Sequence, residues 1–246
     1  MTPARRLRAA ALWILTVVLL LGVIGAVWAH QVMAGDRAAA LEVWRNDAIE
    51  VTSTDTAVVM SPSEGDSATG LVFVPGAKVD PYAYMHKLSG IVEDGATVVI
   101  TKPTLNLALA DLRPLETFTD AAPDVDQWFV GGHSLGGVKA CQYAGDSDVS
   151  GLVLFGSYCA SDLSGSGLAV LSFVAENDGL STPEKIADAA GFLPDDAVTI
   201  DIPGANHADF GDYGVQPGDG ESVADDAEVR LIIADEFRDW TGSLDG

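Results

Sequence analysis

Cysteine, histidine and basic residues are scarce in this chain of 246 residues. The 2 cysteines, Cys141 and Cys159, have no zinc-type spacing, and they form either one disulfide or two buried free thiols. Thirteen Lys and Arg residues stand against 36 Asp and Glu, for a net charge of −23. Because a surface this acidic repels nucleic acid and anionic lipid headgroups, we expect no nucleic-acid partner.

Charge is absent from residues 9–29. A helix of that length reaches about 31 Å, enough to cross the hydrocarbon core of a membrane. Arg5, Arg6 and Arg8 precede it and no acidic residue occurs before Asp36, so the positive-inside rule places the N-terminus in the cytoplasm and the rest of the chain outside. We predict an uncleaved, single-pass signal anchor, and the alternative is a cleaved signal peptide that releases a secreted protein.

The remaining chain has no internal repeat and no linker long enough to divide it. We therefore expect three parts: a cytoplasmic stub with the anchor at 1–30, a juxtamembrane segment at 31–48, and one folded domain at 49–246.

Short apolar runs alternate with helical segments throughout that domain. Fully apolar runs such as Gly70–Val74 and Gly151–Phe155 are typical of strands buried on both faces. The alternation predicts an α/β domain with a mostly parallel sheet and helices on both faces. Two early strands, 49–52 and 57–60, would add an antiparallel edge, and one of the helical regions is expected from about Asn106 to Phe118.

The stretch from Gly132 to Gly136 reads Gly-His-Ser-Leu-Gly and fits the G-x-S-x-G pattern of a nucleophile elbow. An apolar run at 127–130 precedes it, and residues 138–144 suit a helix. Glycine on both sides lets the strand and helix backbones approach. This setting predicts Ser134 at the tip of a strained turn, with its hydroxyl accessible. The alternative is a glycine-rich turn with a buried serine.

The scarcity of histidine narrows the choice of a base. A serine hydroxyl is a poor nucleophile unless a base takes its proton. Of the 4 histidines, His30 lies at the membrane end, His86 in a predicted helix, and His133 beside the serine, from where we expect it to point elsewhere. Only His207 follows Ser134, in a loop after the last predicted strand, where it can lie over the carboxyl ends of the strands.

The base is usually oriented by a carboxylate, which in one class of serine hydrolase lies between the serine and the histidine in the chain. Asp178 follows the preceding strand in a tight turn and is the best candidate. Glu176 is the alternative. Asp209 and Asp212 come after His207 and break this order.

An oxyanion hole needs two N–H donors. The first is the backbone N–H of Leu135, directly after the serine and at the start of a helix, where the dipole favours negative charge. The second belongs to the loop after Gly70–Val74, where Ala77 is our choice and Lys78 the alternative.

These motifs resemble those of the α/β-hydrolases, most closely the compact bacterial members with one N-terminal membrane segment. The resemblance spans most of residues 70–240. It implies an α/β-hydrolase fold with a nucleophile at Ser134, an acid at Asp178 and a base at His207, but no particular substrate. One departure is an oxyanion loop that reads Pro-Gly-Ala, not His-Gly or a run of glycines. The residues that carry the resemblance are 74–81, 131–137, 151–158, 176–179 and 204–211.

The short connection 157–167 leaves no room for the cap domain that members of this fold commonly insert there. We therefore expect an open site that accepts varied or bulky acyl groups. The glycine-rich, acidic segment 211–220 does not fit a calcium-loop pattern and is interpreted as a connector.

Together these patterns predict a membrane-anchored, extracytoplasmic serine hydrolase that cleaves an ester or related acyl bond through an acyl-enzyme. Its partners would be a small-molecule or lipid-like ester and, through residues 9–29, a membrane. Neither a metal nor an organic cofactor is needed. The alternatives are an acyltransferase with the same triad and a catalytically inactive, surface-binding scaffold of hydrolase fold.

Overall fold

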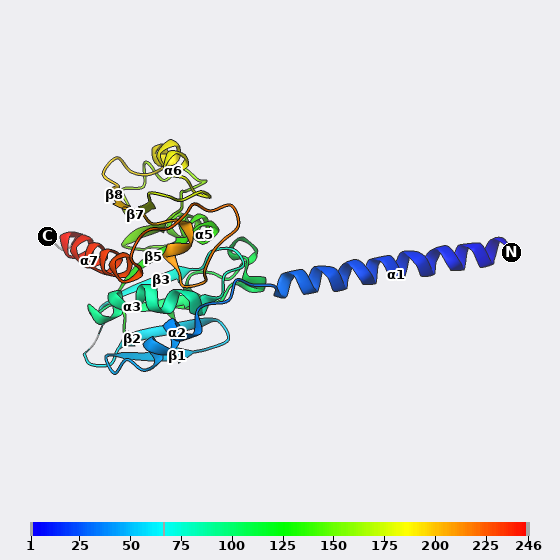
Figure 1. Ribbon diagram of the computed structural model, residues 1–246, viewed down its shortest axis with the longest axis horizontal. Coiled ribbons are helices and arrows are strands. Elements are labelled where there is room, and N and C mark those ends of the chain that lie inside the picture. The colour runs from blue at the N-terminus through cyan, green and yellow to red at the C-terminus, as the bar shows by residue number, and fades with distance from the viewer. Residues whose placement is uncertain (1, 66, 245–246) are drawn as a thin grey trace. The chain divides into compact units, whose positions relative to one another are not determined.

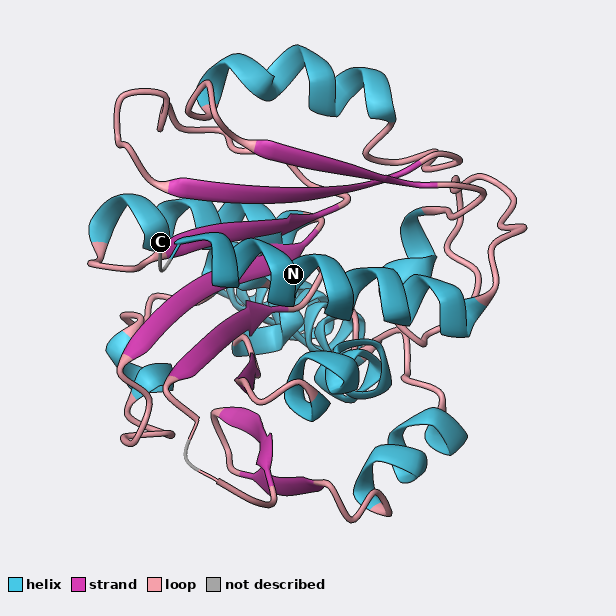
Figure 2. Cartoon of the chain, turned by 90° about the vertical axis from the view of Figure 1, so that its left-hand side faces the viewer, coloured by secondary structure: helices cyan, strands magenta, loops and turns pink. Residues whose placement is uncertain are grey.

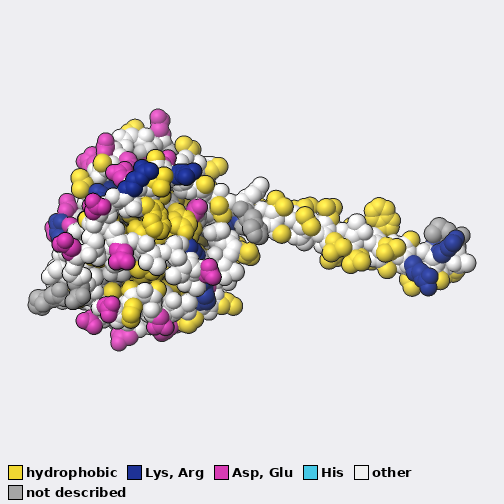
Figure 3. Space-filling view, turned by 90° about the horizontal axis from the view of Figure 1, so that it is seen from below, with side chains coloured by type: hydrophobic (Ala, Val, Ile, Leu, Met, Phe, Trp, Pro, Cys, Tyr) yellow, Lys and Arg dark blue, Asp and Glu magenta, His cyan; other side chains and the backbone are white. Residues whose placement is uncertain are grey.

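The computed structural model describes residues 2–65 and 67–244, and the chain divides between Val32 and Met33 into two compact units. The first unit is helix α1 (Pro3–His30), which carries proline in its first turn, where a missing N–H costs nothing. Hydrophobic side chains run along this helix, with basic ones at one end (Figure 3). With a mean hydropathy that reaches 2.7, it is long and apolar enough to cross a membrane, a property that signal sequences share.

Across residues 33–65 and 67–244, the second unit forms one sheet of eight strands in the order β1-β2-β4-β3-β5-β6-β7-β8 (Figure 1). The pairs β1–β2 and β2–β4 are antiparallel and all the others are parallel. The predicted parallel sheet with an antiparallel edge is confirmed. The strands are β1 (Ile49–Ser53), β2 (Ala57–Pro62), β3 (Thr69–Val74), β4 (Thr97–Thr101), β5 (Gln127–His133), β6 (Gly151–Phe155), β7 (Ala169–Ala175) and β8 (Val198–Ile202).

Helices fill most of the connections between strands. Another helix, α2, precedes the first strand and lies in the segment predicted only as juxtamembrane. Its N-cap is Asp36, whose carboxylate accepts hydrogen bonds from Ala38 N and Ala39 N. The α-helices of this unit are α2 (Arg37–Trp44), α3 (Met85–Glu93), α4 (Glu116–Thr119), α5 (Leu135–Asp146), α6 (Pro183–Ala189) and α7 (Asp226–Leu244). The 3₁₀ turns are η1 (Pro81–Tyr84), η2 (Thr104–Asn106), η3 (Ala108–Ala110), η4 (Ala190–Phe192) and η5 (His207–Phe210).

The sheet is the middle layer between two groups of helices (Figure 2). Successive strand residues point to opposite faces, so Leu71 and Phe73 belong to a core with α3 and α7, while Val72 and Val74 belong to a core with α4 and α5. Both faces are therefore covered, which explains why these strands read as continuous apolar runs. Each such buried side chain contributes roughly 1.5–3 kcal/mol.

The predicted helix from Asn106 to Phe118 is wrong. The chain there forms two single 3₁₀ turns and one turn of helix, η2, η3 and α4. Two causes are evident: Leu105 and Asn106 have φ of 57° and 53°, and Pro114 has no N–H for a helix interior. The irregular backbone leaves this segment on the surface beside the end of β3, where it lines a pocket described below.

Cys141 on α5 and Cys159 in the loop after β6 form a disulfide, with 5.6 Å between their Cα atoms. The choice between a disulfide and two free thiols is thus decided for the disulfide. A crosslink that closes a loop of this size stabilises a fold by about 3 kcal/mol. The disulfide links α5, the helix that follows Ser134, to the loop between β6 and β7.

Candidate active site

Parallel strands place their carboxyl ends at one edge of the sheet, and the predicted site residues follow four such ends. Ser134 comes after β5, the segment of Ala77 after β3, Asp178 after β7 and His207 after β8. The registers of these strands keep the ends level, as Phe155 pairs with His133 on one side and with Phe173 on the other. The fold therefore collects residues up to 130 positions apart at a single edge.

Ser134 occupies the tip of a sharp turn between β5 and α5. Its φ of 54° and ψ of −127° lie outside the regions that a residue with a side chain ordinarily adopts, at a cost of about 1–3 kcal/mol. The turn is held from β6: Ser134 N donates to Phe155 O at 3.1 Å, and the Ser157 hydroxyl donates to Ser134 O at 2.7 Å. The predicted strained turn is confirmed.

The two glycines of the motif are required by close backbone contacts. A Cβ on Gly132 would lie 2.5 Å from the carbonyl carbon of Gly136, and a Cβ on Gly136 would lie closer than 3.0 Å to Val74 O. Any side chain at either position would force β3, β5 and α5 apart.

Asp178 and His207 form a buried pair. His207 Nδ1 lies 2.7 Å from Asp178 Oδ2, and both side chains are fully shielded from solvent. Asp178 Oδ1 accepts from Leu180 N at 2.8 Å and from Ser181 N at 2.7 Å, so both carboxylate oxygens are engaged. His207 Nε2 has no hydrogen-bond partner among residues 2–65 and 67–244.

The alternative acid, Glu176, serves another purpose. Its Oε2 accepts from Gly204 N at 2.7 Å, which fixes the turn between β8 and His207. The structure thus brings Asp178, and not Glu176, to the imidazole.

The prediction that His133 points elsewhere is incomplete, because its ring packs against His207 with 4.3 Å between the centroids. His133 Nδ1 pairs with the Tyr84 hydroxyl at 2.9 Å, and that hydroxyl accepts from Gly76 N at 2.9 Å. Burial, and secondarily the electrostatic interaction with the neighbouring His207, holds the pKa of His133 well below its usual value. Burial also raises the pKa of Tyr84, so both groups stay neutral.

The two N–H groups chosen for the oxyanion hole are both available. Within the described parts of the chain, neither Ala77 N nor Leu135 N donates a hydrogen bond to another residue. The alternative donor, Lys78 N, is already bonded to Asn106 O at 2.7 Å. Ala77 and Leu135 also line one cavity of about 340 Å³, which they share with Leu107, Ala108, Leu109 and Ala110.

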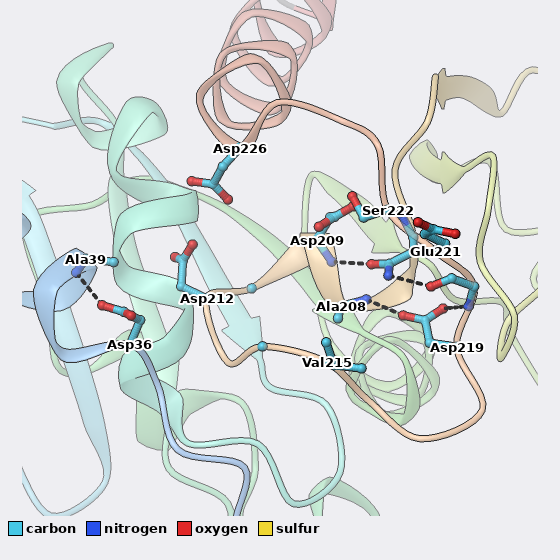
Figure 4. Close-up of a pocket in the computed structure, with 14 residues that line it drawn as sticks. Asp36, Ala39, Ala208, Asp209, Asp212, Val215, Asp219, Glu221, Ser222 and Asp226 are labelled. Atoms are coloured by element: carbon cyan, nitrogen blue, oxygen red, sulfur yellow. Dashed lines mark hydrogen bonds between the residues drawn. The ribbon is translucent and has the colours of Figure 1, made fainter.

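One cluster has the residue types of a cation site. His86, Asp212 and Asp226 each offer a ligand atom, and these atoms lie within 4.8 Å of one another. The Asp212 and Asp226 side chains turn toward each other (Figure 4). The fully buried Lys87 ammonium is ion-paired with Asp226 and lies 3.7 Å from Asp212 Oδ1, so a lysine already supplies the positive charge that a metal would bring.

Reasoning from the sequence missed Tyr84 and Ser157. Neither belongs to a catalytic motif, and each contacts the site from a segment far away in the chain: Tyr84 bonds to a histidine 49 residues later, and Ser157 to a serine 23 residues earlier. The one available signal was Ser157 itself, which follows a predicted strand of the same sheet edge.

Comparisons with known proteins agree with this architecture. A family model described as "Alpha/beta hydrolase family" matches residues 70–230. No curated protein matches the chain.

Solved esterase structures share the fold. The esterase domain of a Rhodothermus marinus protein superposes with a TM-score of 0.57 at 14% identity, over 77% of this chain and 98% of that one. A thermophilic esterase from the Planctomycetes species Thermogutta terrifontis, bound to propionate, gives 0.52 at 16% identity, over 77% of this chain and 93% of that one. Its native form gives 0.50 at 15% identity, over 80% and 95%. At these identities the likeness concerns the fold.

Proposed function

The chain belongs to the alpha/beta hydrolase family, and we propose that it is a serine hydrolase with Ser134 as nucleophile, His207 as base and Asp178 as the carboxylate that orients the base. The observation that carries this proposal is the buried 2.7 Å contact between His207 Nδ1 and Asp178 Oδ2 at the sheet edge where the strained turn of Ser134 lies. A buried carboxylate on Nδ1 leaves Nε2 free to accept a proton.

The reaction would proceed through an acyl-enzyme. His207 Nε2 takes the proton of the Ser134 hydroxyl while Oγ forms a bond to the acyl carbon. The negative charge on the carbonyl oxygen is stabilised by Leu135 N–H and Ala77 N–H. The intermediate collapses, the leaving oxygen takes the proton from His207, and water then repeats the sequence to release the acid and regenerate Ser134.

The surroundings of the site favour an uncharged ester with an apolar acyl group. The cavity beside Ala77 and Leu135 is lined entirely by Ala and Leu side chains. Leu109 and Leu135 are 47% and 44% exposed, so apolar surface borders the site without a cover. Residues 157–168 form no helix, and nothing in that connection resembles a cap. The acidic surface further disfavours anionic substrates.

We place the catalytic unit outside the cytoplasm, on α1 as an uncleaved anchor. The Cys141–Cys159 disulfide supports this placement, since disulfides persist in oxidising compartments. The basic residues before the apolar stretch support the orientation. Detection of the Met1 peptide in purified membranes tests the anchor, and a mature protein that starts near residue 30 would contradict it.

Labelling with a fluorophosphonate probe tests the chemistry directly. The wild-type protein is expected to react, Ser134→Ala is expected not to, and Ser164→Ala, which changes an exposed serine, is expected to react like the wild type. No labelling of a folded wild type would favour the inactive scaffold, and labelling of Ser134→Ala would place the nucleophile elsewhere. A panel of esters of increasing acyl length then ranks substrates, and a product assay with added alcohol detects acyl transfer.

A further inference from the structure

The segment 218–221 lies against both loops that carry the acid and the base. A Cβ on Gly179, next to the acid, would lie 2.7 Å from Gly218 O, and a Cβ on Gly220 would lie closer than 3.0 Å to Asn177 O. The two backbones therefore touch, which only glycine permits at these positions. The sequence indicated a connector in this region, yet its backbone is packed onto the acid loop.

Side-chain amides join the same segment to each loop. Asn177, in the acid loop, donates from Nδ2 to Glu221 O at 3.1 Å. Asn206, directly before the base, donates from Nδ2 to Gly220 O at 2.8 Å. The segment thus bridges two loops that are 29 residues apart in the chain at Asp178 and His207.

The centre of this bridge is the carboxylate of Asp219. Its Oδ1 accepts from Gly179 N at 3.1 Å, from His207 N at 3.1 Å and from its neighbour Gly220 N at 2.8 Å. Its Oδ2 accepts from Ala208 N at 2.9 Å. Figure 4 shows this side chain held between Ala208 and its own loop. One carboxylate therefore binds the residue after the acid, the base itself and the residue after the base.

We propose that Asp219 is a positioning residue that holds the Asp178 loop and the His207 loop in register, so that the acid–base hydrogen bond keeps its geometry. This inference rests on the proposed function, and it assigns Asp219 no contact with substrate. Hydrogen bonds to an ionised acceptor are about twice as strong as neutral ones. The carboxylate is also the one side chain of this size that offers two acceptor oxygens to four N–H donors.

The chemistry of the side chain predicts a graded series. Asp219→Asn keeps the shape and one acceptor oxygen but turns an NH₂ group toward one of the donors. Asp219→Ala keeps no acceptor and leaves all four N–H groups without their partner. We expect kcat for a soluble ester to fall about 10- to 100-fold in Asp219→Ala, by less in Asp219→Asn, and KM to change less than about threefold in both, since a small displacement of a catalytic group lowers the rate of the chemical step.

The matched control is Asp201→Ala. Asp201 is an exposed carboxylate on β8 that forms no side-chain hydrogen bond within the described ranges, so the change removes the same charge without touching the bridge. We expect wild-type kcat and KM for this variant. Thermal unfolding of all variants shows which of them are folded at the assay temperature.

A second readout does not depend on hydrolysis. In a Ser134→Ala background, the proton between His207 Nδ1 and Asp178 Oδ2 should give a strongly deshielded signal in proton NMR. We expect Asp219→Ala to broaden or abolish it, Asp219→Asn to retain it in part, and Asp201→Ala to leave it unchanged.

These measurements separate the two proposals. A wild type that neither hydrolyses esters nor reacts with the fluorophosphonate overturns the proposed function, while the NMR series still decides the role of Asp219. A folded Asp219→Ala with the wild-type signal and kcat within about twofold overturns the positioning role. If Asp219→Ala does not fold, Asp219→Asn decides, and wild-type behaviour of that variant overturns the proposal.

Discussion

Two sets of hydrogen bonds hold the loops of the candidate site, and they differ in charge. On the side of the loop with the predicted oxyanion donor Ala77, Gly76, Tyr84 and His133 form a chain of neutral hydrogen bonds. In this chain the tyrosine is fully buried and the histidine is 1% exposed. On the side of the acid and base loops, the support is an ionised Asp219 that is only half-buried. We call these the neutral support and the charged support.

The difference follows from burial. An ion in the position of Tyr84 would lose its hydration and gain no partner of opposite charge, at a cost of several kcal/mol. At the surface a carboxylate keeps part of its hydration and makes stronger hydrogen bonds than a neutral acceptor. Depth within the fold thus decides which chemistry can hold a loop of the candidate site.

The chain on both sides of the segment 218–221 is also held by charges. Asp212 precedes the segment and Asp226 follows it, and both face His86 and Lys87 on α3. His86 Nδ1 lies 3.7 Å from an oxygen of each aspartate. The charged support therefore includes this cluster as well as Asp219. Each support contains one histidine, His133 in the neutral support and His86 in the charged support.

The largest effect on stability is expected from removing the hydroxyl at the centre of the neutral support. Tyr84→Phe leaves Gly76 N–H and His133 Nδ1 buried without a partner, at about 1–3 kcal/mol for each group. We also expect kcat to fall about tenfold, because Gly76 precedes the predicted oxyanion donor Ala77. Urea unfolding and ester hydrolysis measure the two effects.

The control for this change is Tyr82→Phe. Tyr82 bonds through its hydroxyl to Ser53 and Lys102 at the other end of a short helical turn, where solvent can replace the lost partner. A loss in Tyr84→Phe no larger than that in Tyr82→Phe would contradict the neutral support.

The next effect concerns the pH dependence of stability through His133. The pKa of His133 is lowered in the folded protein, so below pH of about 6.5 the unfolded chain binds a proton that the folded protein does not. The free energy of unfolding should therefore decrease as the pH falls from about 6.5, by at most about 1.4 kcal/mol per pH unit. Denaturant titrations at a series of pH values should show this slope in the wild type and not in His133→Gln, and an equal slope in both would contradict it.

The smallest effect is the pH dependence of stability through His86, and its sign is opposite to that of His133. The Asp212 carboxylate raises the pKa of His86 against the effect of burial, with Asp226 also raising it and Arg230 lowering it. The folded protein then binds a proton more tightly than the unfolded chain, so this contribution to stability is complete below about pH 6.5 and is lost as the pH rises through the folded pKa.

His86→Gln should remove that contribution. The comparison of wild type and variant between pH 6 and about pH 8 isolates it. His133→Gln is the parallel variant, which lacks the contribution of His133 to the pH dependence. If the difference between wild type and His86→Gln grows as the pH rises, the assigned sign is wrong.

Much of the fold and of the candidate site was predictable because the signals are local. Apolar runs of five residues predict buried strands, and their alternation with helices predicts a parallel sheet, both of which the structure confirms. The Gly132–Gly136 motif predicts a strained turn at Ser134, and its ψ of −127° agrees. The order of Ser134, Asp178 and His207 along the chain predicts which acid meets which base, and the structure brings Asp178 and His207 to 2.7 Å. Their catalytic roles stay predictions.

One feature of the fold was predicted wrongly and another was left undecided. Residues 106–118 have a helix-like composition, but positive φ at Leu105 and Asn106 and the nearby Pro114 break the helix. The pairing of Cys141 with Cys159 could not be decided from spacing, because it depends on where α5 lies beside the end of β6.

The amino-acid sequence by itself determined the strands, the turn at Ser134 and the identity of the residues available as acid and base. These depend on neighbours along the chain: the period of apolar residues, the glycines that flank a serine, and a single histidine downstream of it. Only the tertiary structure decided what holds those residues in place. Tyr84 reaches His133 across 49 residues and Asp219 reaches Gly179 across 40, and hydrogen bonds over such separations leave no local pattern because they depend on the packing of the whole domain.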